Sequence, residues 1–311
     1  MSSQEPPALR EELKSTTEVP SRVKKVLVLT SPKAGSGSGR DQVPRLLATL
    51  QNRCDALQTS SLDEFRTHVA QPHDDGELVV VAAGGDGTLA LVAQNMPSSI
   101  PIVPMPMGTE NLLARHFGFS CDASRVAETI FNGTSHSMDA GSANGKLFLV
   151  MATCGFDAEV VRAMHLTRSG HIRRYHYAKP IFRTLRKYRF PELTIRVNGQ
   201  GPVSLSSRWA MVFNVPRYGG ALNIEPDADE SDGQLDLITF KNGGLLSGIS
   251  YLAAIAFGRH RKRKDVERQQ ISSLTIESDS RVAYQLDGDY GGQLPLTIKV
   301  LPNRVRFLMP K

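Results

Sequence analysis

The sequence predicts an α/β domain followed by an antiparallel all-β domain. Residues 78–82 form a short Val-rich run that ends in a glycine turn and leads into a helix-compatible stretch at 89–95. Such a run is typical of a buried parallel strand. A strand, a glycine-rich loop and a helix also follow one another over residues 23–52. After Gly141 the pattern changes to short strand-like segments separated by turn residues, which is typical of an antiparallel sandwich.

The composition narrows the class of protein, its partners and its cellular compartment. The chain has 311 residues, enough for two domains, and its 40% hydrophobic and 22% charged content is that of a soluble globular protein. A net charge of +6 favours anionic partners such as nucleotides, nucleic acid or an acidic membrane surface, although a mildly basic protein without them fits equally well. The cysteines show no CxxC spacing, and we see neither a signal peptide nor a membrane-spanning run. We therefore expect a cytoplasmic protein with reduced thiols.

The N-terminal elements follow in order. Residues 1–22 are polar and rich in proline, serine and threonine, which predicts a disordered tail. Residues 23–30 predict the first strand, and the glycine-rich loop after it leads into a helix that ends near Asn52. This loop lacks both the GK[ST] ending of a Walker A loop and the GxGxxG pattern. A flexible surface loop and a phosphate-binding loop both remain open. A short strand at 56–60 and a helix at 62–70 are expected next.

The turn after the Val-rich strand carries the sequence Gly84-Gly85-Asp86-Gly87-Thr88. Glycines let backbone N–H groups approach a ligand closely, and the start of a helix favours an anion. A carboxylate beside a phosphate is repelled unless a cation lies between them, so Asp86 suggests a magnesium nucleotide. An ordinary tight turn is the alternative. The Val-rich strand and the glycine-Asp pattern together favour a phosphate-binding turn over it.

A second turn follows the apolar run at 100–104. Its residues Gly108-Thr109-Glu110-Asn111 precede a predicted helix. The hydroxyl of Thr109 and the amide of Asn111 could bind a phosphate there, or Asn111 could simply cap the helix. A further helix is expected at 122–131.

The second half predicts strands at 147–153, 193–198, 208–215, 234–240, 271–277, 282–286, 296–300 and 304–308. Two acidic segments lie among them, at 226–236 and at 286–289. In the second of these, Asp287 and Asp289 flank a glycine at a strand end. Residues two apart in an extended segment point to the same side, so both could face one pocket, where repulsion would raise one pKa towards that of a general base. A plain Asp-Gly hairpin turn is the alternative.

These blocks resemble the diacylglycerol kinase catalytic-domain family, which includes bacterial lipid kinases and is related to sphingosine kinases. The segments SPKAGSGSG, GGDGT, PMPMGTENLLAR, YGG with DESDGQLD, and LDGD match the family's blocks in order. NAD kinases share GGDGT, but the Asn-Glu pair that follows it there is absent here. The chain departs from the family's pattern at Ser31, Ala34, Leu112, Ser231 and Asp289.

The resemblance implies a fold and a reaction. The fold is a phosphofructokinase-like, Rossmann-like α/β nucleotide-binding domain at residues 23–141 and 301–311, with an antiparallel β-sandwich at 142–300. The reaction is the ATP- and Mg²⁺-dependent phosphorylation of a lipid hydroxyl, with diacylglycerol or a sphingoid base as acceptor. Two alternatives stay open: a kinase of the same fold for NAD or a sugar, and a non-catalytic nucleotide-binding regulatory protein.

The resemblance also implies site residues. Contacts to the nucleotide are expected from Ser31, Gly35, Ser36, Gly37, Thr59, Gly84, Gly85, Asp86, Gly87, Thr88, Gly108, Thr109 and Asn111. The catalytic candidates are Asp86, Asp287 and Asp289, with either of the last two as proton acceptor. A structural Mg²⁺ is expected on the side chain of Asp232 and the backbone carbonyls of Asp229 and Gln234.

A lipid kinase without a spanning helix must reach its substrate from the bilayer surface. Residues 245–257 are apolar but too short to span, and the basic run 259–264 follows directly. One interpretation is a buried helix with a solvated charged loop, and the other is contact with anionic head groups. We expect a lipid substrate at an anionic membrane surface and no nucleic acid, and a homodimer stays open.

Overall fold

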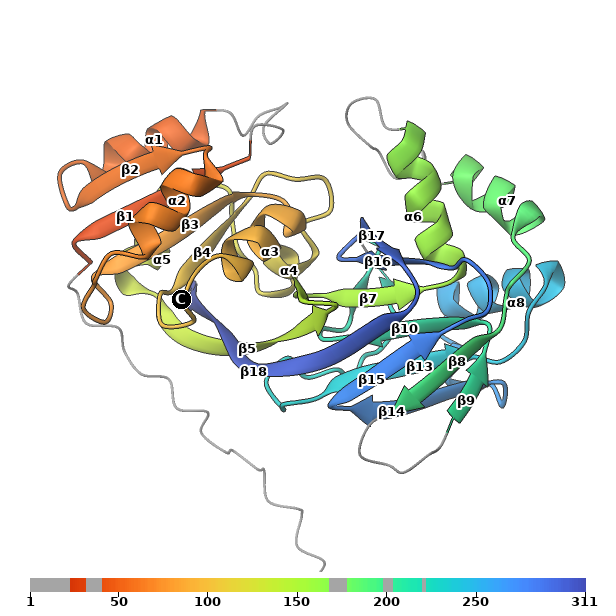
Figure 1. The fold of residues 1–311 in the computed structure, drawn as a ribbon. Helices are drawn as coiled ribbons and strands as arrows, with labels where there is room; N and C mark the ends of the chain where they lie inside the picture. The colour runs from red at the N-terminus through yellow and green to blue at the C-terminus, as the bar shows by residue number, and fades with distance from the viewer. Residues whose placement is uncertain (1–22, 32–40, 168–177, 198–203, 220–221) are drawn as a thin grey trace, which may run out of the picture.

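The computed structural model describes residues 23–31, 41–167, 178–197, 204–219 and 222–311. The predicted tail at 1–22 and most of the first glycine-rich loop lie outside these residues. Figure 1 shows a helix-covered half, which contains the N-terminal elements, beside a half built mainly of strands. The predicted fold class, an α/β domain with an antiparallel β-sandwich, is confirmed.

Parallel strands form the sheet of the first half. Their order is β2 (Asp55–Thr59), β1 (Lys25–Thr30), β3 (Leu78–Gly84) and β4 (Ile102–Pro106). Helices α1 (Gln42–Leu50) and α5 (Ala123–Asn132) cover one face, and α2 (Leu62–Val69) and α3 (Asp86–Gln94) cover the other. Strand β3 is buried throughout, because Val79 and Val81 pack under one pair of helices while Leu78 and Val80 pack under the other. This two-sided burial explains its unbroken apolar sequence.

Two sheets form the second half. One has the order β14 (Val266–Ile271), β13 (Leu235–Phe240), β10 (Trp209–Phe213), β7 (Met151–Cys154), β16 (Ala283–Leu286) and β17 (Asp289–Gln293). The facing layer contains β15 (Ser273–Glu277), β8 (Leu193–Val197), β9 (Ser204–Ser207) and β6 (Lys146–Phe148). Phe148, Val212 and Ile276 are among the buried residues between the layers.

Two long strands join the halves, β5 (Thr134–Ala143) and β18 (Leu296–Met309), and Figure 1 shows them side by side below both. The first part of β18 pairs with β15 on one side, its last part pairs at Phe307 with Ile102 of β4, and β5 pairs with both parts. The strands expected at 296–300 and 304–308 are therefore one strand with an irregular register between Leu301 and Val305. The domain boundaries proposed at 141 and 301 fall inside β5 and β18, so the halves share a continuous sheet.

The irregular segment of β18 is fastened on both sides. Asp139 of β5 is buried, and its carboxylate accepts a hydrogen bond from the Asn303 amide at 2.7 Å and another from the Gly233 amide at 2.7 Å. The Arg304 guanidinium donates to the carbonyls of Ala93 and Met96 at 2.7 and 3.2 Å, at the end of α3. A cation there suits the negative end of the helix dipole.

The remaining elements lie around this framework. They are α4 (Leu112–His116), α6 (Phe156–Thr167), α7 (Ala178–Lys187), α8 (Leu245–Ala256), the short helix η2 (His260–Lys262), β11 (Arg217–Tyr218) and β12 (Leu222–Asn223). The strands β5, β9, β14 and β17 were not predicted, because polar residues or glycines interrupt their apolar alternation. Among the described residues, no helix combines the length and apolarity needed to cross a bilayer.

Asp139 gives a direct test of the junction. In Asp139→Asn the side-chain NH₂ group faces an amide donor, so one of the two buried N–H groups loses its acceptor. We expect the free energy of unfolding in urea to fall by about 2 kcal/mol. The control is Asp41→Asn, an exposed carboxylate that caps nothing with its side chain, for which we expect less than about 0.5 kcal/mol. Equal losses in both variants would show that Asp139 does not fasten the junction.

Candidate active site

The glycine-rich loops meet at one edge of the parallel sheet. Strands β1, β2, β3 and β4 end there, and open α/β sheets bind ligands outside the carboxyl ends of their strands. Ser31 follows β1, and its amide donates to the carbonyl of Ala83 in β3 at 3.3 Å. The structure thus brings together the described members of the predicted nucleotide site. The predicted residues Gly35, Ser36 and Gly37 lie outside the described residues.

Two of the predicted glycines touch through their backbones. A Cβ atom on Gly108 would lie 2.6 Å from the Cα atom of Gly85, and a Cβ atom on Gly84 would lie 2.2 Å from the hydroxyl oxygen of Thr88. Both contacts are too close for any side chain, so these positions require glycine. The two turns consequently pack directly against each other at the start of α3.

Asp86 connects these two turns, and Asn111 closes the second turn on itself. The Asp86 carboxylate accepts from the amides of Leu112 and Leu113 at 2.9 and 3.1 Å and so caps α4 from another element. Asn111, in a left-handed conformation with φ of 48°, exchanges two 2.9 Å hydrogen bonds with the backbone of Gly108. Burial raises the pKa of Asp86, and its amide donors oppose the rise. The sequence did not suggest this capping role, because Asp86 and its partners lie 26 and 27 residues apart.

The hydroxyl of Thr59 forms hydrogen bonds with residues that follow it closely in the chain. It donates to the Glu64 carboxylate at 2.6 Å and accepts from the Ser61 amide at 3.0 Å, at the start of α2. The side chain is buried. Thr109, in contrast, is exposed in the second turn. Nucleotide contacts by these two residues stay predictions.

The segment LDGD forms the hairpin between β16 and β17. Leu286 pairs with Asp289, and Asp287 and Gly288 between them have φ of 50° and 88°, a combination typical of a two-residue hairpin turn. The expectation that Asp287 and Asp289 point to the same side was wrong, because the backbone there is a turn and not an extended strand. The alternative of an Asp-Gly hairpin is confirmed.

Asp287 points back into the protein. Its carboxylate accepts from three successive amides, those of Leu149, Val150 and Met151, at 2.8, 2.8 and 2.9 Å. Burial raises the pKa of Asp287 to about 7, the Asp86 carboxylate adds to the rise, and the three amides oppose it. The two carboxylates are therefore close enough to interact across the junction between the halves.

Asp289 is exposed and reaches the nucleotide half. A Cβ atom added to Gly87 would lie 2.8 Å from its carboxylate oxygen Oδ2. The side chain thus lies against the first turn of α3, where a bound phosphate is expected. Of the three predicted catalytic residues, Asp86 and Asp287 hold backbone amides and Asp289 presents its carboxylate outside the protein core.

A buried relay fastens the other side of the hairpin. The side-chain oxygen of Gln285 accepts from the Gly288 amide at 2.7 Å, and its NH₂ group donates to the Thr153 hydroxyl at 3.0 Å. Thr153 donates to Asp157, which also accepts from the Trp209 indole at 2.7 Å. Burial raises the pKa of Asp157. Sequence reasoning missed this relay because its members come from separate elements and share no motif.

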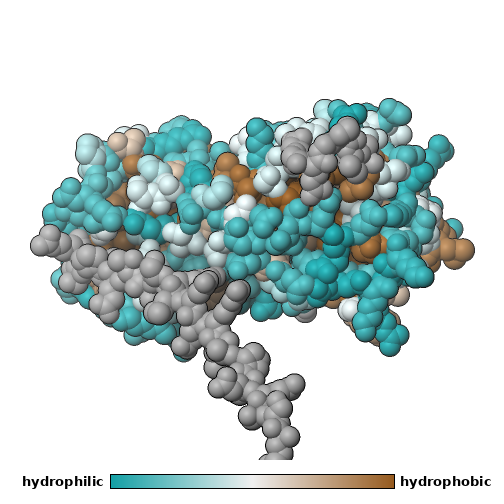
Figure 2. Space-filling view, turned by 90° about the horizontal axis from the view of Figure 1, so that it is seen from below, coloured by the Kyte–Doolittle hydropathy of each residue, from teal (hydrophilic) through white to brown (hydrophobic). Residues whose placement is uncertain are grey.

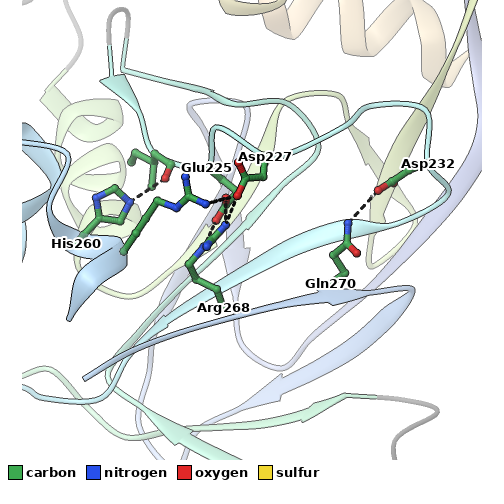
Figure 3. Close-up of polar contacts among 8 residues, drawn as sticks. Glu225, Asp227, Asp232, His260, Arg268 and Gln270 are labelled. Carbon is green, nitrogen blue, oxygen red and sulfur yellow. Dashed lines mark hydrogen bonds and ion pairs between the residues drawn. The ribbon is translucent and has the colours of Figure 1, made fainter. Parts of the chain in front are cut away.

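The carboxylates of the acidic turn predicted to hold Mg²⁺ accept hydrogen bonds from neighbouring residues. Asp232 accepts from the Gln234 amide at 2.8 Å and from the Gln270 side chain at 3.0 Å, and Figure 3 shows the second of these bonds. Asp229 accepts from the amide and hydroxyl of Ser231 at 2.9 and 2.8 Å. Burial raises the pKa of nearby Asp236 to about 6, helped by Glu225 and Asp232. This excess of negative charge suits a cation, but the Mg²⁺ site stays a prediction.

Two surface cavities lie outside this candidate site. A cavity of about 330 Å³ is lined by β13 and β14, and one of about 430 Å³ lies beside the C-terminal residues. Neither is lined by Asp86, Asp287 or Asp289. Within the described residues, no three His, Cys, Asp or Glu side chains are grouped so as to hold a metal ion. The converging backbone amides and the Asp289 carboxylate therefore identify the candidate site.

Known proteins match both halves. Residues 150–309 match the family described as "YegS C-terminal NAD kinase beta sandwich-like domain", and residues 25–143 match "Diacylglycerol kinase catalytic domain". The chain is 27% identical to a diacylglycerol kinase of Mycobacterium tuberculosis (strain CDC 1551 / Oshkosh) over 92% of this chain and 96% of that protein. It is 27% identical to one of Bacillus subtilis (strain 168) over 75% of this chain and 78% of that protein.

Solved structures show the same fold. A diacylglycerol kinase from Bacillus anthracis str. Sterne superposes with a TM-score of 0.64 at 19% identity, covering 92% of this chain and 97% of that one. An NAD kinase from Archaeoglobus fulgidus, solved in complex with ATP, gives a TM-score of 0.50 at 14% identity over 92% and 94%. The likeness confirms the predicted pairing of an α/β domain with a β-sandwich.

Asp86 should matter for stability. In Asp86→Asn the side-chain oxygen can accept from one α4 amide while the NH₂ group faces the other. We expect urea denaturation to show a loss of about 1–3 kcal/mol. Asp122→Asn is the matched control, since Asp122 caps α5 by accepting from one amide and asparagine is an equally good cap. If both variants unfold at the same urea concentration, Asp86 does not bridge the turns.

Asp287 should make stability depend on pH. A carboxyl group with a folded pKa of about 7 and an unfolded pKa of about 3.9 binds more protons when folded between these values. The free energy of unfolding therefore falls as pH rises through this window. Between pH 5 and pH 8, Asp287→Asn should reduce that fall by about 2–3 kcal/mol, measured by urea titration at each pH. Identical falls for the two proteins would contradict the raised pKa.

Proposed function

The chain belongs to the diacylglycerol kinase catalytic-domain family, and on this premise we propose that it transfers the γ-phosphate of ATP to a lipid hydroxyl. Membership of a kinase family makes it a phosphotransferase. The proposal adds the nucleotide, the class of acceptor and the residues that act. Diacylglycerol or a sphingoid base is the acceptor class.

One observation carries the proposal: the Asp289 carboxylate lies against Gly87 at the start of α3. Phosphoryl transfer depends mainly on positioning the acceptor hydroxyl in line with the γ-phosphate and on stabilising the developing charge. A helix start that suits a phosphate, with a carboxylate beside it that can take a proton, supplies both parts.

Each group then has one task. The amides at the start of α3 and in the adjoining turn bind the phosphates, and Gly85 and Gly108 let the backbone approach them. Asp289 accepts the proton of the lipid hydroxyl as that oxygen attacks. Mg²⁺ bound with the nucleotide would neutralise negative charge on the phosphate oxygens. The acidic turn around Asp232 would hold a second Mg²⁺ of structural use.

Asp287 acts as a positioning residue in this scheme. Its three amide bonds hold the hairpin on the segment between β6 and β7, and the Gln285 relay holds Gly288 from the other side. Because both attachments lie within two residues of Asp289, they restrict where its carboxylate can move. Asp289 is one methylene shorter than the glutamate of the family, so this restriction bears directly on its reach.

The test is the substitution Asp289→Asn, which removes the proton acceptor and preserves the shape. We expect kcat to fall by about 10²–10⁴-fold while the KM for ATP changes little, measured with detergent-dispersed diacylglycerol and sphingosine. Asp289→Glu should keep substantial activity. Asp279→Asn, which changes an exposed carboxylate in the segment between β15 and β16, is the control and should match the wild type. Near-normal turnover by Asp289→Asn would refute the assignment.

The same assay separates the alternatives. Phosphate transfer to NAD or a sugar, and not to lipid, would make the protein a kinase of soluble substrates. Binding of ATP without transfer to any acceptor would make it a non-catalytic nucleotide-binding protein. Either result would replace the proposed function.

A further inference from the structure

We propose that α8 and the basic residues after it form a docking surface for an anionic lipid bilayer. We call this the α8 surface. Its apolar part consists of Leu245, Leu246, Ile249 and Phe257, and its basic part of Arg259, Lys262 and Lys264. The choice of a bilayer rests on the proposed lipid substrate, while binding itself can be measured without turnover.

The apolar part is exposed and concentrated. Leu246 is 82% exposed and Phe257 is 77% exposed. Within the described residues, the only large apolar side chain of comparable exposure away from α8 is Leu91. Figure 2 shows hydrophobic side chains protruding at the right end of the molecule, where Figure 1 places α8. Such a concentration marks a surface for binding another apolar phase.

The inner face of α8 fixes the orientation of this surface. Gly248, Tyr251 and Ile255 are buried against the second half. The Tyr251 hydroxyl donates to the Asp265 carboxylate at 3.0 Å, and Arg263 donates to Asp265 at 2.8 Å and to the Ser250 hydroxyl at 2.7 Å. A helix held in this way cannot turn its outer leucines inwards.

The basic run divides into bound and free residues. Arg263 is bound to Asp265, and Arg261 is bound to Asp227, beside the pair formed by Glu225 and Arg268. Figure 3 shows Arg268 between Glu225 and Asp227, together with buried His260, whose ring nitrogen lies 2.8 Å from the Ile224 carbonyl. Arg259, Lys262 and Lys264 are exposed and have no ion-pair partner among the described residues. From the sequence, the whole run 259–264 could contact lipid head groups. The structure leaves three of its residues available for this contact.

Charge favours a bilayer over a second copy of the chain. No aspartate or glutamate occurs from 245 to 264. A two-fold dimer through the α8 surface would place the same basic residues near one another and repel. An anionic bilayer instead offers phosphate groups to the basic part and acyl chains to the apolar part, as for interfacial amphipathic helices.

Helices α7 and α6 connect the α8 surface to the hairpin of the candidate active site. Helix α6 contacts β17, which begins with Asp289, and α7 contacts both α6 and α8. Figure 1 shows these helices together on one side of the second half. Exposed Arg183 and Lys187 of α7 add positive charge beside α8. Docking through α8 would therefore bring the helices beside the site close to the bilayer.

The test is sedimentation with vesicles of equal parts phosphatidylglycerol and phosphatidylcholine, compared with phosphatidylcholine alone, without ATP. We expect the full-length protein to sediment with the anionic vesicles at 0.1 M salt and to be released as screening strengthens at 1 M. The variant Arg259→Gln/Lys262→Gln/Lys264→Gln should need at least tenfold more lipid for half-maximal binding. The variant Leu246→Ser/Phe257→Ser should also lose at least tenfold. Circular dichroism should show both variants folded.

A charge-matched control distinguishes binding through the α8 surface from binding caused by the net charge of the protein. Arg45→Gln/Arg125→Gln/Lys299→Gln removes three exposed basic residues elsewhere and should bind vesicles as the wild type does. Equal binding by the wild type and the α8 variants would overturn the proposal, as would equal binding to neutral vesicles. A dimer that becomes a monomer in Leu246→Ser/Phe257→Ser would overturn it in favour of self-association.

Kinase assays on detergent-dispersed lipid keep this result apart from the proposed function. The α8 variants should turn over dispersed lipid as the wild type does, because the surface lies outside the catalytic groups. Lipid kinase activity without α8-dependent vesicle binding would reject the docking surface alone. Vesicle binding without any lipid phosphorylation would reject the proposed function alone.

Discussion

The candidate site depends on β18, a strand that belongs to both halves of the molecule. It pairs with β15 inside the sandwich and, at Phe307, with Ile102 at the start of β4, while β5 pairs with it along both parts. Asp139 and Arg304 fasten the irregular segment between these parts. Because the hairpin that carries Asp289 lies in one half and the start of α3 in the other, this shared strand sets the distance between them.

Buried carboxylates complete that arrangement by binding backbone amides. Asp86 receives the first amides of α4, and Asp287 accepts from three successive amides that lead into β7. Each carboxylate offsets part of its desolvation with charge-assisted hydrogen bonds, which are stronger than those between neutral groups. Two acidic residues that a sequence motif marks as catalytic can thus hold the site together, and the proposed proton acceptor is the exposed Asp289.

The sequence predicted those parts of the fold that depend on local patterns. The Val-rich run of β3 and its glycine turn follow from strand burial and turn chemistry, whereas a nucleotide site that includes both GGDGT and GTEN was implied by the family resemblance. Strand β5 escaped prediction because its sequence TSHSMDAGSA has little apolar alternation, although β18 pairs with it along most of its length. The caps by Asp86 and the relay through Gln285 escaped because each joins residues far apart in the chain. Such contacts exist only once the halves have packed.

Nucleotide geometry tests the central claim, that the two halves assemble one phosphoryl-transfer site. The measurement is a crystal structure with Mn²⁺ and a non-hydrolysable ATP analogue. We expect the terminal phosphate within hydrogen-bond reach of the amides of Gly85 and Gly87, with the Asp289 carboxylate facing it across the space for the acceptor hydroxyl. A nucleotide bound elsewhere, or one whose terminal phosphate points away from Asp289, would contradict it.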